Sequence, residues 1–171
     1  MKKTLTNKIA QLTLALALTF GGSLTAQANT LPETFFGQSP TSIFTQHPTA
    51  KPLNLEGIPE VLSIVTDTQM DLLFGEPVDL VKYSFLQNML FQVELDFNKC
   101  DLEAFKNLYL NIALIYGEGQ FSQENTAQNH LKQKYKWDLE DRIIVLYRLD
   151  FGSYQNISLD VIAKRPDIAV L

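Results

Sequence analysis

Four carboxylates at alternating positions are the residues of this sequence that could do chemistry together. They are Glu94, Asp96, Asp138 and Glu140. Side chains two residues apart in a strand point to the same face, so each pair would project from one side of its strand. If the two strands adjoin, with Asp150 and Asp160 nearby, the carboxylates form one acidic patch on a sheet face.

An acidic patch of this kind has three interpretations. Hydrolysis of a glycosidic bond needs two carboxylates about 5 to 9.5 Å apart, one of them with a raised pKa. The same charge would attract a basic partner protein. The third interpretation is a solvated face without a function, because basic side chains are interspersed with the acids. These are Lys82, Lys134, Lys136 and Arg148.

The other reactive residue types form no recognisable constellation. His47 and His130 have no His or Cys at metal-ligand spacing, and the strained Gly-x-Ser-x-Gly turn of many hydrolases is absent. We therefore expect no metal, no cofactor and no catalytic triad. Cys100 is the only cysteine, so it cannot form an intramolecular disulfide, and we expect a buried structural thiol.

Two leucines depart from the apolar pattern of a helix expected over residues 101–116. Its core-facing positions are Leu102, Phe105, Leu108, Tyr109, Ile112, Ile115 and Tyr116. Leu110 and Leu114 lie on the other side. Leaving them wet costs about 25 cal/mol per Å² of apolar surface, so we expect a cover. The loop around Phe121, an aromatic linker or another protein are the alternatives, and Ile144 and Leu146 raise the same question on the outer sheet face.

Period-two patterns predict the strands that carry these residues. Residues 81–85 and 89–97 alternate between apolar and polar types, with Gln87–Asn88 as a short hairpin turn between them. Three further strands are expected from residue 135 to residue 163, with turns at Glu140–Asp141 and Gly152–Ser153.

The remaining segments complete the predicted fold. Residues 66–74 indicate a short helix that ends before Gly75, and residues 120–133 indicate a polar loop. Residues 58–65 fit either a strand or a helical turn. The predicted fold class is α+β: an antiparallel sheet of about five strands, two before and three after the long helix that covers one face.

The N-terminal region has the pattern of a cleavable bacterial signal peptide over residues 1–28. Three lysines precede an apolar run that is too short to span a bilayer, and Ala26-Gln27-Ala28 supplies a small-residue cleavage site before Asn29. A proline-rich linker is expected over 29–53 and a single domain over 54–171. We therefore expect a periplasmic or secreted protein without a stable membrane anchor.

The net charge of the chain without its signal peptide limits the kinds of partner that it can bind. Without the three signal-peptide lysines the chain has 11 basic residues against 19 acidic ones, a net charge of −8. Such a chain repels phosphate backbones and anionic lipids, so we expect no nucleic-acid binding. A cationic protein is the electrostatically favoured partner, although solubility alone also explains an acidic surface.

The segment Gln69-Met70-Asp71-Leu72-Leu73-Phe74-Gly75-Glu76-Pro77, followed by strands ending Leu90-Phe91-Gln92-Val93-Glu94-Leu95-Asp96-Phe97, resembles a small bacterial envelope module. Outer-membrane-assembly small lipoproteins and secreted β-lactamase-inhibitor proteins are similar over about residues 66–97. The resemblance implies a non-catalytic, protein-binding role. The chain lacks the lipid-bearing cysteine and the disulfides of those families, and none of their binding residues has a matching position.

The sequence therefore favours a non-catalytic protein-binding module, either an envelope assembly factor or an inhibitor or immunity protein against a cationic partner. The expected partner-binding residues are Leu110, Leu114, Glu94, Asp96, Asp138 and Glu140. Two alternatives are open: a carboxylate-based hydrolase of envelope glycan or peptide, and a protein that binds a small apolar ligand between Phe91, Tyr109, Trp137 and Tyr147.

Overall fold

The computed structural model describes residues 31, 36–53, 61–67, 72–97, 100–126, 128 and 130–164. The expected signal peptide and its cleavage site lie outside these residues. Among the helices of the described part, none is long and apolar enough to cross a membrane.

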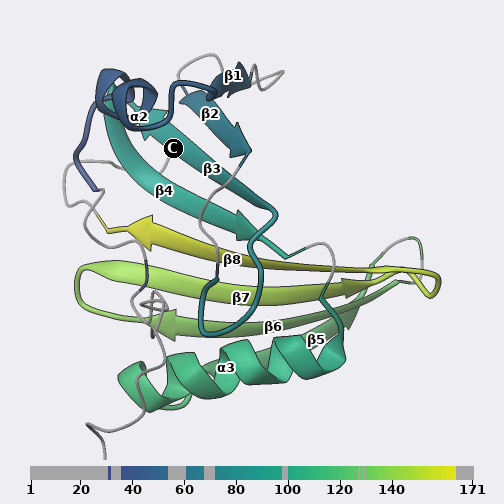
Figure 1. Ribbon diagram of the computed structural model, residues 1–171. Coiled ribbons are helices and arrows are strands. Elements are labelled where there is room, and N and C mark those ends of the chain that lie inside the picture. Colours follow the sequence, from purple (N-terminus) through teal and green to yellow (C-terminus); the bar gives the residue numbers. More distant parts are fainter. Residues whose placement is uncertain are drawn as a thin grey trace, which may run out of the picture.

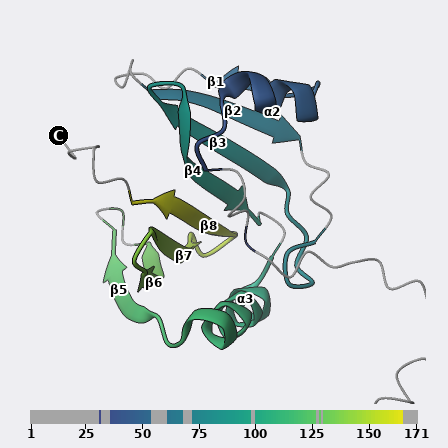
Figure 2. The ribbon, with the colours of Figure 1, turned by 90° about the vertical axis from the view of Figure 1, so that its left-hand side faces the viewer.

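One antiparallel sheet of eight strands dominates the structure, in the order β1-β2-β3-β4-β8-β7-β6-β5 (Figure 1). Its elements are α2 (Pro40–Gln46), β1 (Lys51–Leu53), β2 (Val61–Asp67), β3 (Leu80–Leu86), β4 (Met89–Asp96), α3 (Leu102–Tyr116), β5 (Gln120–Asn125), β6 (Leu131–Asp138), β7 (Arg142–Asp150) and β8 (Gln155–Ala163). The sheet twists strongly across its width, with α2 beside the β1–β4 part and α3 beside the β5–β8 part (Figures 1 and 2).

The predicted α+β fold with about five strands is wrong. Strands account for 51% and helices for only 19% of the structure, so it is mainly a β protein. Residues 120–133, expected as a loop, instead provide all of β5 and the start of β6. Thr66 and Asp67, expected at the start of a short helix, end strand β2. Hydrophobic alternation could not predict β5, because neither face of this polar strand is buried.

Local signals position the other elements as expected. The hairpin between β3 and β4 turns at Gln87 and Asn88, which both have positive φ, 52° and 63°, as a primed two-residue turn requires. The side chain of Asp101 accepts hydrogen bonds from the backbone N–H groups of Glu103 and Ala104 and caps α3. The helix ends at Gly117, whose φ is 82°.

The stretch expected to be a linker, 29–53, contains two elements of the fold in its described part. Pro40–Gln46 forms α2, in which Ile43 is fully buried, and Lys51–Leu53 forms edge strand β1. Phe36 and Phe44 pack against the hydrophobic core. These aromatics therefore dock on their own domain, and Phe35 lies outside the described residues.

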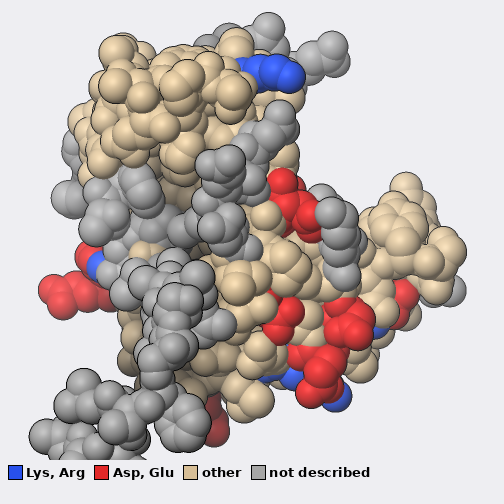
Figure 3. Space-filling model, in the orientation of Figure 1, with Lys and Arg blue, Asp and Glu red and all other residues tan. Residues whose placement is uncertain are grey.

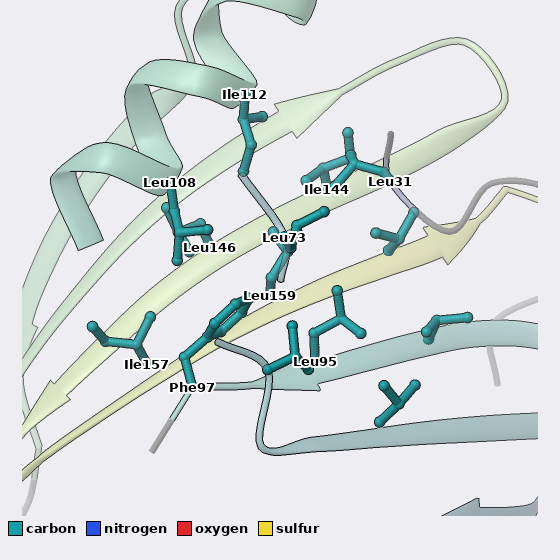
Figure 4. Packing of buried hydrophobic residues seen from close by; sticks show 14 of the residues in the cluster. Leu31, Leu73, Leu95, Phe97, Leu108, Ile112, Ile144, Leu146, Ile157 and Leu159 are labelled. Atoms are coloured by element: carbon teal, nitrogen blue, oxygen red, sulfur yellow. The ribbon is translucent and has the colours of Figure 1, made fainter. Parts of the chain in front are cut away.

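The core lies on one face of the sheet, which we call the covered face. Leu108 and Ile112 of α3 lie over Ile144 and Leu146 of β7, with Leu159 of β8 close by (Figure 4). All five side chains are fully buried. Ile144 and Leu146 therefore belong to the core, and the expectation that they lie on the outer face is wrong.

An aromatic cluster packs α3 against β6. The ring centroids of Tyr109 and Tyr135 are 4.1 Å apart, and those of Tyr109 and Trp137 are 6.0 Å apart. Trp137 Nε1 donates a hydrogen bond of 2.8 Å to the carbonyl oxygen of Gly117. A Cβ at Gly119 would lie only 2.7 Å from the Trp137 ring, so glycine is required where the chain leaves the helix.

Two leucines of α3 make a matched test of this packing. Leu108→Ala empties a fully buried position and is expected to lower the free energy of unfolding by about 3 kcal/mol. Leu114→Ala removes the same atoms from a side chain that is 84% exposed, so a change below about 0.5 kcal/mol is expected. Urea unfolding followed by tryptophan fluorescence measures both, and equal losses for the two variants would contradict this placement of α3.

Candidate functional site

The face of the sheet opposite the core, which we call the second face, brings acidic side chains of neighbouring strands together. Along one row of the ladder, Lys82 of β3 opposes Glu94 of β4, and Glu94 in turn opposes Asp160 of β8. In the next row Asp96 opposes Ser158, which opposes Tyr147 of β7. We call Glu94, Asp96 and Asp160 the acidic cluster.

Only part of this negative charge is compensated. Lys82 Nζ forms an ion pair with Glu94 Oε2, and the hydroxyl of Tyr147 donates a hydrogen bond to Asp160 Oδ2. Asp160 is only 6% exposed, and its Oδ1 is buried without a hydrogen-bond partner among the described residues. Glu94 and Lys82 remain accessible, with 21% and 22% of their side chains exposed.

Two carboxyl groups of the cluster, those of Asp160 and Asp96, have raised pKa values. Burial raises the pKa of Asp160 to about 6, and the nearby charge of Glu94 raises it further against the lowering effect of the Tyr147 hydrogen bond. Burial and the charge of Glu94 also raise the pKa of Asp96 to about 6. Like charges opposite one another in a sheet destabilise it, so the cluster costs the fold stability at neutral pH.

The other two predicted carboxylates do not join the cluster. Asp138 ends β6, three strands from β4 in the sheet order, which corresponds to about 14 Å at the usual strand spacing. It pairs with Lys136 at 2.9 Å and with Lys164, and their hydrogen bonds lower its pKa. Glu140 lies exposed in the turn between β6 and β7. The four carboxylates therefore form no single patch.

The two predicted apolar positions on α3 are both open to solvent. Leu110 is 58% exposed and Leu114 is 84% exposed. Phe121, whose loop was one expected cover, lies in β5 with its ring 5.0 Å from that of Tyr135. Acidic side chains gather on the part of the surface where α3 begins, with few basic ones among them (Figures 1 and 3). Asp101 and Glu103 begin this helix, and both are exposed.

The remaining reactive residues are held in structural contacts. The ring of His47 stacks on that of Tyr83 at 6.0 Å, and His130 meets Phe151 edge-on at 4.8 Å. Cys100 is half-buried, and burial with the nearby charges of Glu76, Asp79 and Asp101 raises its pKa to about 11. Its thiol is therefore protonated at neutral pH and a poor nucleophile. No group of three His, Cys, Asp or Glu suited to a metal occurs among the described residues.

Four aromatic residues expected to line a ligand cavity do not share a space. Tyr109 and Trp137 pack together on the covered face. Tyr147 lies on the second face beside Asp160. The sheet itself therefore separates Tyr147 from the other two, and one cavity between helix and sheet cannot include all of them.

Comparison with known proteins identifies no relative from which a role could be transferred. No protein-family model, no curated protein and no solved structure matches this chain.

The raised pKa of Asp160 predicts how stability depends on pH. A carboxyl with a higher pKa in the folded chain stabilises the fold below its unfolded pKa near 3.8, and this contribution is lost as pH rises through about 6. Asp160→Asn abolishes that loss. Relative to the native chain, the variant is expected to gain on the order of 2 kcal/mol of unfolding free energy between pH 4 and pH 7, measured by urea unfolding.

Asp138→Asn is the matched control with the opposite sign. The pKa of Asp138 is lowered, so its charge stabilises the fold above the unfolded pKa and this contribution is lost as pH falls. The variant should lose stability toward pH 7 instead of gaining it. The same pH slope for both variants would disprove the raised pKa of Asp160.

Proposed function

We propose that this protein is a non-catalytic protein-binding module of the bacterial envelope that binds a basic partner through its acidic cluster. The observation that carries the proposal is the opposition of Glu94 and Asp160 in adjacent strands, with Asp96 two residues further on β4. A sheet face that only has to be soluble does not need three carboxylates beside a single lysine, because their repulsion destabilises the fold.

A cationic group would relieve this repulsion. Glu94 and Asp96 are only partly buried, so an ammonium or guanidinium group can reach their oxygens. Arginine forms two parallel hydrogen bonds with a carboxylate, and this geometry fits two acids on one strand face. Asp160 is too buried for direct contact and acts by deepening the negative potential beneath Glu94 and Asp96.

The apolar surroundings of the cluster also suit a protein partner. Val145 opposes Asp160 in the same row, and Leu80 opposes Asp96 in the next one. Both side chains are half-buried and remain partly accessible. Interfaces commonly join a few desolvated charges to an apolar centre in this way. The predicted signal peptide adds the envelope location to the proposal.

The same carboxylates support one alternative, an envelope glycan or peptide hydrolase. A carboxyl with a pKa of about 6, as in Asp96, on the same strand face as Glu94 has the pattern of an acid and base pair. The separation of Asp138 and Glu140 from the cluster restricts this alternative to Glu94, Asp96 and Asp160. Loss of hydrolysis in Asp96→Asn, measured on envelope glycan, would favour it over binding alone.

Matched double variants test the binding proposal. Purified native protein is expected to capture a basic protein from envelope extract. Glu94→Gln with Asp96→Asn should weaken that complex at least about tenfold, because two charge-assisted contacts are lost. Asp138→Asn with Glu140→Gln removes the same groups elsewhere and should leave the affinity within about twofold.

Titration of the captured partner by calorimetry gives the affinities. An acidic partner, or equal affinities for both double variants, would contradict the proposal. Leu110→Asp with Leu114→Asp adds a third arm for the exposed face of α3. If this variant alone loses the partner, the helix face and not the acidic cluster is the binding surface.

A further inference from the structure

The two edges of the sheet are protected to different degrees. Edge strand β1 has only three residues and contains Lys51 and Pro52, and short strands with lysine and proline resist pairing with another chain. Edge strand β5 has six residues, all exposed, and contains neither lysine nor proline. On its outer side β5 pairs with no strand of the described chain, so its backbone groups are free to bind another strand.

The strand beside this edge carries a row of positive charge. Lys132, Lys134 and Lys136 of β6 share the second face, and Glu124 of β5 lies opposite Lys132. Lys132 pairs with Glu124 at 3.5 Å and Lys136 with Asp138 at 2.9 Å. Lys134 forms no ion pair with a described residue and lies opposite Ser122, whose short side chain leaves the space above the edge open.

We propose that two copies of this chain pair through their β5 strands, antiparallel, to form one continuous sheet of sixteen strands. Directly opposite residues of antiparallel strands point to the same face, so only pairings that match even with even positions and odd with odd positions are allowed. The pairing that centres on Gln123 places Gln123 opposite Gln123 of the second copy. It also places Ser122 opposite Glu124 of the second copy.

Charge complementarity selects this pairing. Glu124 of the second copy lies across Ser122 from Lys134, and Lys134 forms no ion pair with a described residue of its own chain, where Glu124 pairs with Lys132. Long side chains reach diagonal and next-strand neighbours on the same sheet face, so Lys134 can meet this glutamate above Ser122. The two-fold symmetry repeats the contact, and each copy contributes one lysine and one glutamate. Glu124 has 66% of its side chain exposed before pairing.

A charge-swap series tests the dimer in solution. The native chain is expected to sediment as a dimer at micromolar concentration in analytical ultracentrifugation. Glu124→Lys places like charges against Lys134 of the other copy, and Lys134→Glu places two glutamates together. Each single variant should raise the dissociation constant of the dimer at least about tenfold. The double variant restores both pairs with reversed sign and should restore the dimer.

Disulfide trapping tests the register independently of charge. Opposite Cα atoms of antiparallel strands lie about 4.5 to 5.5 Å apart, within the range of a disulfide. In a Cys100→Ser background, Gln123→Cys is expected to form a covalent dimer under mild oxidation. Leu53→Cys on the opposite edge is the control and should form no covalent dimer.

Three results would overturn the proposal. They are a native chain that stays monomeric up to about millimolar concentration, a dimer unaffected by the single charge variants, and trapping at residue 53 but not at residue 123. All the substituted β5 and β6 positions are at least partly exposed, and circular dichroism verifies that each variant is folded. None of the outcomes depends on the acidic cluster, so this proposal and the proposed function fail separately.

Discussion

Burial of β7 beneath α3 is the constraint on which the rest of the structure depends. Ile144 and Leu146 are fully buried under Leu108 and Ile112. Because side chains alternate along a strand, burying these two on the covered face sends Tyr147 to the second face, and a slip of one residue would exchange the two sets. The register between β7 and β8 then places Asp160 on the same side as Tyr147.

The fold could be predicted from the sequence wherever a local signal decides the structure. Asp101 as a cap, the centre of the apolar stripe of α3, the turn at Gln87–Asn88 and the three C-terminal strands all depend on neighbouring residues. The ends of the predicted stripe are wrong, because Leu102 and Ile115 are exposed. Strand β5 could not be predicted, because Gln120–Asn125 is exposed on both faces. Backbone pairing with β6, together with the contact of Phe121 on Tyr135, stabilises it in place of a buried face.

The orientation of β7 shows a second limit of pattern reading. Apolar residues occupy both alternating sets, Ile144 and Leu146 on one side and Ile143, Val145 and Tyr147 on the other. Hydrophobic period alone cannot choose between two apolar faces. Contact with α3 makes the choice, and this contact is tertiary. The half-buried second set gives the second face its unusual mixture of aliphatic and charged side chains.

The candidate site also has one part that local sequence predicts and one part that depends on strand order. Glu94 and Asp96 share a face because they are two residues apart, and this much is local. Their neighbour Asp160 is 64 residues beyond Asp96 in sequence and meets them only because β8 inserts between β4 and β7. Strand order is set by the whole sheet and has no local signal, so Asp160 was no more prominent in the sequence than Asp138, which lies three strands from β4.

The two proposed surfaces are linked by the symmetry of the sheet. A two-fold axis through the β5 edge is perpendicular to the sheet, so it keeps the second face of both copies on the same side. Each acidic cluster lies on β4 and β8, well inside its own half, and the lysines of β6 lie between the clusters and the shared edge. A dimer therefore presents two acidic sites on one surface, separated by a basic band. A partner with two basic segments would gain avidity from this arrangement. A single acidic segment would be attracted only to the lysines of the basic band.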